Sequence, residues 1–301
     1  MDRLEFLDLN AAIKHFAVKL NNSNGVESTS DINSESYKKL LGGELIQQFF
    51  IIKNAKAVLS SWENHKYFKW WMHGELMSEV LNLDPPIMYK YKPEMFGQHY
   101  KLLDDGRMQY SYGSRWNEYN QLVNIYQKLK KNPNSKRCVV QIYTPYDTEP
   151  GRKDCPCTCS YHFIHRDGKL NMTIHYRSWD FFGGFKTYDF ALSSFILQSL
   201  CSWLGMEPGE LGFYVNSLHY YNRDEEQMAH LVEEVNNNFD MSKYLELDGN
   251  LEIGKYYDEL RKVKLSEEMA HAGNFKLSEE IEESLSCNLF KDMCRTWRKR
   301  Q

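Results

Sequence analysis

The spacing of apolar residues along the chain predicts two amphipathic helices and one buried helix. Apolar positions recur at helical intervals over residues 66–83 and 118–131, and each segment is followed by a proline-containing stretch that would end a helix. Residues 189–204 form an apolar run that is too long for a strand, and Gly205 directly after it is suited to a helix C-terminus. This last helix is therefore expected to lie in the core.

Short runs of β-branched and aromatic residues predict a set of strands. The first run, over residues 44–60, predicts one strand or a strand pair, and it follows a polar, turn-rich stretch over 21–36 that predicts an exposed loop after an opening helix. Asp167-Gly168 separates two further runs and is typical of a β-hairpin turn. These two runs cover residues 159–165 and 169–175. Two more strands are predicted over residues 138–143 and 211–219.

The chain changes character after about residue 224, where it becomes acidic and helical. Short helices are predicted over residues 266–270 and 278–284. The basic residues at 295–300 are interpreted as a solvated end of the chain. We therefore expect one catalytic domain over residues 1–301, with a helical extension from about 225.

Composition narrows the class of protein. The 301 residues are 42% hydrophobic and carry 41 acidic and 37 basic side chains, a formal net charge of −4. No apolar run approaches the roughly 20 residues that span a bilayer, and the charged N-terminus does not resemble a secretory signal, so we expect no membrane partner and a cytoplasmic location, or a host's cytoplasm if the protein is viral. The near-neutral charge also disfavours binding of duplex DNA, which leaves an enzyme acting on small molecules as the leading class.

Cysteines are the first candidates for chemistry, because seven is an odd number and a reducing compartment favours free thiols. Three of them, Cys155, Cys157 and Cys159, lie at alternate positions just before a predicted strand. They could be zinc ligands, although the usual second cysteine pair is missing, or small residues packed at the start of a strand. One of them could also be a nucleophile, which would need a cation nearby to lower the pKa of the thiol.

The sequence downstream of the cysteines contains suitable neighbours in a fixed order. The segments are Tyr176-Arg177-Ser178-Trp179-Asp180, Gly183-Gly184-Phe185 and Asn216-Ser217-Leu218-His219-Tyr220-Tyr221. Considered singly, an arginine is most often a surface charge and a histidine a satisfied structural residue. Their combination with Cys157 is much more informative.

The ordered motifs resemble those of the thymidylate synthase superfamily over about residues 74–224. The resemblance rests on Pro156-Cys157, the segment 177–180, the segment 217–221, Tyr112-Gly113 with Trp116, the turn at 134–137, and Gly168-Lys169-Leu170. It implies an α/β (α+β) fold of the thymidylate synthase type, with a mixed sheet that is covered by helices on one face. It also implies a homodimer that forms through the other face of the sheet.

Within the superfamily, the chain looks most similar to the phage-type deoxycytidylate (dCMP) hydroxymethylases. Asp189 falls where synthases have an asparagine that reads uracil, and Thr158 falls where synthases have a histidine. A carboxylate can accept hydrogen bonds from the cytosine 4-amino group and from protonated N3, whereas an amide matches uracil. Asp189 therefore favours a cytosine substrate, and its alternative is a helix N-cap.

The resemblance also implies a role for each matching residue. Cys157 would be the nucleophile, with Arg177 and Ser178 on the nucleotide phosphate and Asp189 on the base. Glu75 and Tyr112 would order catalytic waters and assist proton transfer. Asp180 would meet the folate pterin, or the base through water, and Gly184 would contact the folate. His219 and Tyr221 would hold the sugar 3′-hydroxyl, while Lys136 and Arg137 would reach the phosphate across the dimer interface.

The expected activity is hydroxymethylation at C5 of a pyrimidine nucleoside monophosphate, dCMP or CMP, with 5,10-methylenetetrahydrofolate and water. Two alternatives remain: a thymidylate synthase acting on dUMP, and an inactive homologue that binds nucleotides or RNA. Three departures from the family bear on them. The arginine of the N-terminal phosphate loop has no counterpart within 21–36, although Lys38 or Lys39 could replace it, the tryptophan pair expected near 95–100 is missing, and a longer basic tail replaces the short apolar C-terminus.

Overall fold

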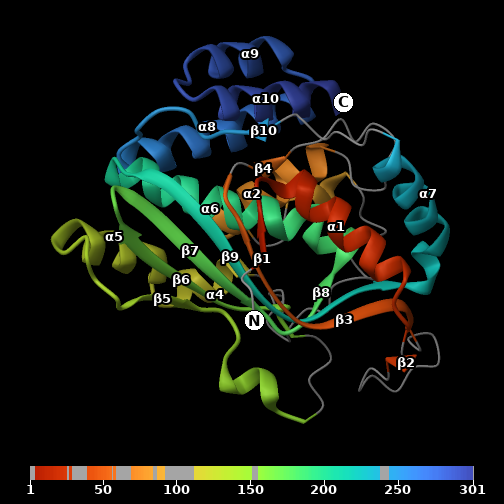
Figure 1. The fold of residues 1–301 in the computed structure, drawn as a ribbon. Coiled ribbons are helices and arrows are strands. Elements are labelled where there is room, and N and C mark those ends of the chain that lie inside the picture. Colours follow the sequence, from red (N-terminus) through yellow and green to blue (C-terminus); the bar gives the residue numbers. More distant parts are fainter. Residues whose placement is uncertain are drawn as a thin grey trace.

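A mixed β-sheet forms the centre of the protein (Figure 1). The computed structural model describes residues 4–25, 27–28, 39–55, 57–58, 69–83, 87–91, 112–150, 155–237 and 244–300. Eight strands make up the sheet, in the order β1-β3-β9-β7-β6-β5, with β2 paired to β3 and β8 paired to β9. The strands are β1 Leu4–Phe6, β2 Glu27–Ser28, β3 Lys39–Ile52, β5 Cys138–Gln141, β6 Thr158–Arg166, β7 Lys169–Tyr176, β8 Trp179–Asp180 and β9 Glu207–Tyr221.

The sheet contains both parallel and antiparallel pairs. β9 runs parallel to β7 and β8 but antiparallel to β3, and β3 in turn is parallel to β1. The hairpin between β6 and β7 is confirmed, because Asp167 and Gly168 both have positive φ angles, 52° and 79°, as a tight primed turn requires. A separate two-stranded sheet pairs β4 Ala57–Val58 with β10 Tyr244–Leu245.

Most of the helices that were predicted from the spacing of apolar residues are confirmed. They are α1 Leu9–Asn21, α2 Lys69–Leu81, α4 Tyr112–Glu118, α5 Gln121–Lys131, α6 Tyr188–Leu204, α7 Glu225–Asn236, α8 Ile253–His271, α9 Phe275–Glu283 and α10 Asn288–Arg300. Shorter turns are η2 Ile87–Lys90, η4 Pro145–Thr148, the π-turn η5 Phe181–Phe185 and η6 Asn222–Asp224. Among the helices described, none combines the length and the apolar character that crossing a bilayer requires.

Some predicted boundaries were wrong for identifiable reasons. The predicted helix over 118–131 is broken at Asn120, whose φ of 51° is left-handed, so α5 begins only at Gln121. The helix predicted to begin at residue 189 begins at Tyr188 with Thr187 as its N-cap, and it ends at Gly205 as expected, with a φ of 64°. Parts of the predicted loop over 21–36, Lys38, residues 84–86 and the segment 95–100 lie outside the described residues, as does the side chain of Lys39.

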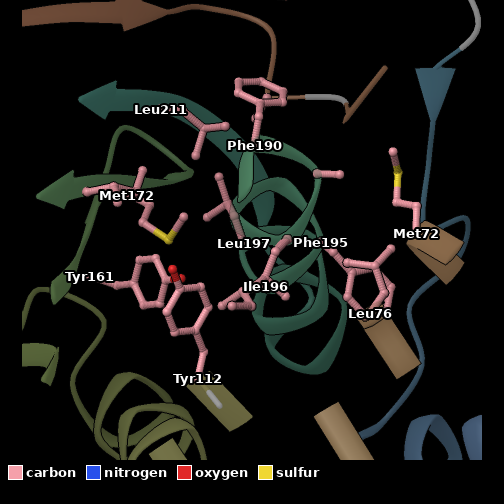
Figure 2. Packing of buried hydrophobic residues seen from close by; sticks show 14 of the residues in the cluster. Met72, Leu76, Tyr112, Tyr161, Met172, Phe190, Phe195, Ile196, Leu197 and Leu211 are labelled. Carbon is pink, nitrogen blue, oxygen red and sulfur yellow. The ribbon is translucent and has the colours of Figure 1, made fainter. Parts of the chain in front are cut away.

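The two faces of the sheet differ in their cover. Helices α1, α2 and α6 lie on one side, and α8, α9 and α10 form an outer layer beyond α2 and α6 (Figure 1). α6 contributes much of the core, and Figure 2 shows its Phe190, Ile196 and Leu197 packed against residues from the sheet and from α2. On strands β3, β5 and β6, by contrast, Ile46, Phe49, Val139 and Ile164 are exposed.

The basic end of the chain is only partly solvated, so the interpretation of residues 295–300 as a solvated end was incomplete: Arg295 and Lys299 are exposed, but one face of the segment is buried. Residues 288–300 form the helix α10, and Trp297 within it is fully buried. Its indole stacks on Tyr91 with ring centroids 5.1 Å apart, and it lies so close to Gly74 of α2 that a Cβ on that glycine would be 3.1 Å from the ring. Apolar positions at helical spacing outweigh the charged composition of this segment, since burial of one face stabilises an amphipathic helix.

Candidate active site

Arg177 anchors the cysteine segment that precedes β6. Its backbone N–H donates to the carbonyl of Cys157 at 3.0 Å. Its guanidinium donates to the carbonyls of Pro156 at 2.9 Å and Cys155 at 2.8 Å. The side chain thus places a positive charge beside the Cys157 thiol while it remains exposed on its outer side. Burial lowers the pKa of Arg177, but the neighbouring Cys157 and Cys155 raise it overall.

The three cysteines have different surroundings. The Cys155 thiol donates to the backbone carbonyl of Asp147 at 3.2 Å, and burial raises the pKa of Cys159 even though Arg177 opposes this effect. Cys157 is partly buried and next to the guanidinium. In the part of the chain that the structure describes, no cluster of three or more side chains suited to a metal is found, so the zinc interpretation gains no support. The geometry favours Cys157 as the reactive thiol.

An ion pair that the sequence analysis did not identify lies next to the cysteine segment. Arg115 of α4 donates two hydrogen bonds to the Asp147 carboxylate, at 2.6 and 2.7 Å, and Asp147 is 4% exposed. Burial by itself would raise the pKa of Asp147, but Arg115 and Thr144 together lower it. The motif was visible as a capping box, in which Thr144 stands three residues before an acidic residue.

Strand pairing brings the segments 177–180 and 217–221 together. Asp180 of β8 lies opposite His219 of β9, whose Nδ1 is 3.1 Å from the Ser217 hydroxyl. The rings of His219 and Tyr221 pack edge to face, with centroids 5.1 Å apart. Burial and then the charges of Asp180 and Cys157 raise the pKa of Tyr221 to about 12. Tyr221 of the predicted sugar-binding pair therefore lies within electrostatic reach of Cys157, the predicted nucleophile.

Asp180 presents a partly exposed carboxyl at the place where a folate contact is predicted. One carboxylate oxygen accepts the backbone N–H of Phe182 at 3.0 Å, and the other is 4.0 Å from the Arg223 guanidinium, while 22% of the side chain is exposed. Burial raises the pKa of Asp180 to about 6, and the charge of Asp224 adds to this effect. An accessible carboxyl next to the glycines of η5 matches the N–H donors of a pterin ring. This part of the site fits the cofactor.

Asp189 lies in the first turn of α6 and is held by an indole. The Trp179 Nε1–H donates to Asp189 Oδ2 at 2.9 Å. Burial raises the pKa of Asp189 to about 7, against the effect of the Trp179 hydrogen bond, and the charges of Asp180 and Glu79 raise it further. The N-cap of α6 is Thr187, so capping does not account for the position of Asp189.

Tyrosines connect Asp189 to the other predicted catalytic residues. Tyr112 of α4 and Tyr161 of β6 meet with their hydroxyls side by side (Figure 2). Tyr188 lies among the acids Glu79, Glu75 and Asp189, whose charges raise its pKa after burial has done so. The structure thus gathers Glu75, Tyr112 and Asp189 around one phenol.

Glu79 is a residue of this site that sequence reasoning missed. Its carboxylate accepts the backbone N–H of Gly113, directly after Tyr112, and it therefore joins α2 to the start of α4. A Cβ at Gly113 would lie 2.1 Å from the Glu79 carbonyl oxygen, so only glycine fits there. The signal was available, because Glu79 is one helical turn after Glu75 and shares its helix face.

Three predicted residues are not joined to this group by any contact of the described chain. Lys136 and Arg137 are exposed in the turn between α5 and β5, where Lys128 donates to the Arg137 carbonyl at 2.8 Å. Ser178 is partly exposed next to Arg177. Their roles toward a phosphate remain predictions.

Comparison with known proteins gives one family and several partial relatives. The family model described as thymidylate synthase matches residues 41–266. Thymidylate synthase of Listeria monocytogenes serotype 4a is 29% identical over 160 residues, 48% of this chain and 50% of that protein. A putative thymidylate synthase of Methanosarcina mazei is 32% identical over 160 residues, 50% of this chain and 72% of that protein. Deoxyuridylate hydroxymethyltransferase of Bacillus phage SP01 is 33% identical over 108 residues, 35% of this chain and 28% of that protein. The chain thus spans about half the length of the Listeria relative.

Proposed function

Because the chain belongs to the thymidylate synthase family, we propose that it is a folate-dependent transferase that hydroxymethylates C5 of a cytidine monophosphate, dCMP or CMP. The observation that carries the choice of base is the Asp189 carboxyl, held by Trp179 and close to the predicted catalytic residue Tyr112. Two carboxylate oxygens match the 4-amino group and protonated N3 of a cytosine adduct. The amide found at this place in synthases matches uracil.

In this proposal Cys157 starts the reaction. Its thiolate, stabilised by Arg177, adds to C6 of the pyrimidine and makes C5 nucleophilic. Arg177 and Ser178 bind the nucleotide phosphate, and His219 and Tyr221 bind the sugar. Asp189 stabilises the positive charge that the cytosine ring gains in the adduct.

The other residues of the proposed site transfer protons and orient water. Burial and then the charge of Asp189 raise the pKa of Tyr112 well above its ordinary value, so its phenol stays a neutral donor next to the reacting carbons. Glu75, 9% exposed on α2, orients the water that completes the hydroxymethyl group. When it is bound, 5,10-methylenetetrahydrofolate supplies a one-carbon unit at the oxidation level of formaldehyde, and Asp180 and Gly184 hold it beside C5.

One comparison favours a second candidate, C5 modification of dUMP. The phage relative is a deoxyuridylate hydroxymethyltransferase by name. With a pKa of about 7, Asp189 can also carry a proton, and a neutral carboxyl then offers one donor and one acceptor, as an amide does. An inactive binding homologue is disfavoured because Cys157, Arg177, Asp180 and His219 are all present.

The decisive assay is tritium release from C5 of dCMP, CMP and dUMP, measured in parallel with 5,10-methylenetetrahydrofolate. Release from a cytidine nucleotide, with a hydroxymethylated product and tetrahydrofolate, is expected. Release from dUMP together with dihydrofolate would instead identify a thymidylate synthase. Release from none of the three would contradict the proposed function.

We also propose a homodimer that forms through the open face of the sheet. The exposed side chains of Ile46, Phe49, Val139 and Ile164 lie on strands of that face, and Lys136 and Arg137 are free of contacts to the described site of their own chain. If Arg137 completes the partner's phosphate site, mixing Arg177→Ala chains with Arg137→Ala chains should restore a fraction of the activity. A dimer with no recovery at any mixing ratio would contradict the shared site.

A further inference from the structure

The Asp189 carboxyl is oriented by a side chain that has no freedom to move. Trp179 is fully buried and stacks on Tyr176, with ring centroids 4.0 Å apart and planes 7° from parallel. It also stacks on Phe213 at 5.2 Å and meets Phe185 edge to face at 4.9 Å. Packing on three sides fixes the indole, so its N–H has one direction, toward Asp189 Oδ2.

Gly184 makes this hydrogen bond possible. A Cβ at that position would lie 2.5 Å from Asp189 Oδ2 and 2.7 Å from the Trp179 Nε1 atom. Any larger residue would separate the indole from the carboxyl. Three residues from β8, the π-turn and α6 therefore form one unit around the Oδ2 atom.

The hydrogen bond from Trp179 favours the ionised form of Asp189, whereas the other neighbours of Asp189 favour the protonated form. An indole N–H can only donate, so it stabilises an acceptor oxygen. The titratable groups that face Asp189 are carboxyls and phenols: Asp180 on β8, Glu79 on α2, Tyr112 on α4, Tyr161 on β6, Tyr176 on β7 and Tyr188 on α6. Burial and the two negative charges favour protonation, and the Trp179 hydrogen bond opposes it.

We propose that Trp179 is a specificity-determining positioning residue, whose indole N–H holds Asp189 as a carboxylate turned toward the base and thereby favours cytosine over uracil. This inference rests on the proposed function of the same site. A cytosine adduct protonated at N3 pairs with the ionised carboxylate, which has two acceptors. Uracil, with an acceptor at O4 and a donor at N3, pairs with the protonated carboxyl. At any fixed pH, stabilising the carboxylate therefore stabilises the cytosine complex more than the uracil complex.

The test is Trp179→Phe, which keeps an aromatic ring but removes the donor. The ratio of kcat/KM for dCMP to that for dUMP should fall about tenfold. A change of that size corresponds to the free energy of one hydrogen bond to a charged group. Trp203→Phe is the matched control, because Trp203 is also a buried tryptophan, 6% exposed, and packs on Tyr256 of the C-terminal layer. The control should keep the wild-type ratio. Equal losses on both nucleotides in Trp179→Phe would show a structural role only and overturn the inference.

A second readout does not depend on turnover. Infrared spectroscopy follows the C=O stretch of a protonated carboxyl, and the band that Asp189→Asn removes identifies Asp189. Its pH midpoint should rise in Trp179→Phe and in Gly184→Ala, while it stays in place in Trp203→Phe. An unchanged midpoint in both site variants would overturn the inference even if the nucleotide assays failed. Absence of tritium release in wild-type protein, with the midpoint shifted as expected, would contradict the proposed function alone.

In a double-mutant cycle, Trp179→Phe should lose its effect on base choice once Asp189 is already asparagine, because an amide cannot ionise. The same selectivity change in both backgrounds would contradict an action through the Asp189 carboxylate.

Discussion

The buried acids of the C-terminal helices and the partly buried acids around Cys157 have different hydrogen-bond partners. In the helices, each acid has a full set of donors: Glu259 accepts from Ser286 and Cys287, Glu267 from Tyr91 and Lys90, and Glu282 from Arg295 and Arg298. In the site, Asp189 accepts from the Trp179 indole and Asp180 from the backbone of Phe182 and Gly183, but burial outweighs these donors and raises the pKa of Asp189 to about 7 and that of Asp180 to about 6. The acids of the helices stabilise the fold, whereas acids with raised pKa values are candidates for contact with a ligand.

Removing the proposed nucleophile, Cys157, should give the largest effect, because it should abolish activity and leave the stability of the helices unchanged. Cys157→Ala should lower turnover and C5 tritium release by at least roughly a thousandfold, because no other thiol has the same position beside Arg177. The unfolding midpoint should stay near the wild-type value, since the side chain is partly exposed. Cys159→Ala is the control and should remain active; an inactive Cys159→Ala with an active Cys157→Ala would move the nucleophile to Cys159.

Glu282→Gln should have the opposite effect: the free energy of unfolding should fall, and the activity of the folded protein should be unchanged. Glu282 is 8% exposed and pairs with two arginines, and Arg298 is itself largely buried. Leaving Arg298 without its charge partner should cost about 2–3 kcal/mol of unfolding free energy, less than a fully buried pair because Arg295 is solvated. Denaturant unfolding measures this cost, and the reaction of the folded protein should be unchanged. A stable but inactive variant would show that the two regions are not separate.

Asp189→Asn is the matching change of acid to amide within the site. The amide places an NH₂ opposite the cytosine 4-amino group, so kcat/KM for the cytidine nucleotide should fall about tenfold to a hundredfold, the cost of unpaired donors. The same amide suits uracil, so dUMP should gain relative to dCMP. Measuring dCMP, CMP and dUMP with both proteins tests this prediction. A wild-type preference for dUMP, or an unchanged ratio, would contradict the assignment of cytosine.

The smallest expected effect is a pH-dependent gain in stability in the same Asp189→Asn variant. The pKa of Asp189 is about 7 in the folded protein and about 3.9 in an unfolded chain, so the ionised group destabilises the fold above pH 7, and this penalty is relieved as the pH falls toward 4. The variant should therefore be more stable than wild type at pH 8, by about 1–2 kcal/mol once partial exposure is considered. Thermal unfolding between pH 5 and 8 should show the difference shrinking at the acid end; parallel curves would contradict it.

Local chemistry explains what could be predicted from the sequence. The hairpin at Asp167-Gly168 and the cap at Gly205 depend on neighbouring residues only, and both were predicted correctly. The motifs around Cys157 were in the right order, and the sheet brings Asp180 and His219 side by side.

Residues that depend on packing between distant segments were the ones missed. The role of Glu79 depends on where α4 meets α2, and that of Arg115 on the fold of η4. In α10 the apolar positions Phe290, Met293 and Trp297 are at helical spacing, but the basic residues between them suggested a solvated end. That apolar face packs on α8, where Phe290 meets Tyr256 edge to face, and on α2, where Trp297 lies against Gly74. Since α2 is far away in the sequence, composition alone could not identify it as a neighbour.

The contact between Trp297 and Gly74 also sets an order of events during protein synthesis. The helix α2, which carries Glu75, is synthesised well before α10, the helix that packs on it. At about 5–20 residues per second, the interval is on the order of ten seconds or more. Through that time, the surface of α2 around Gly74 lacks the cover that Trp297 provides in the folded protein. Any factor that binds nascent apolar segments therefore has access to α2 before α10 does.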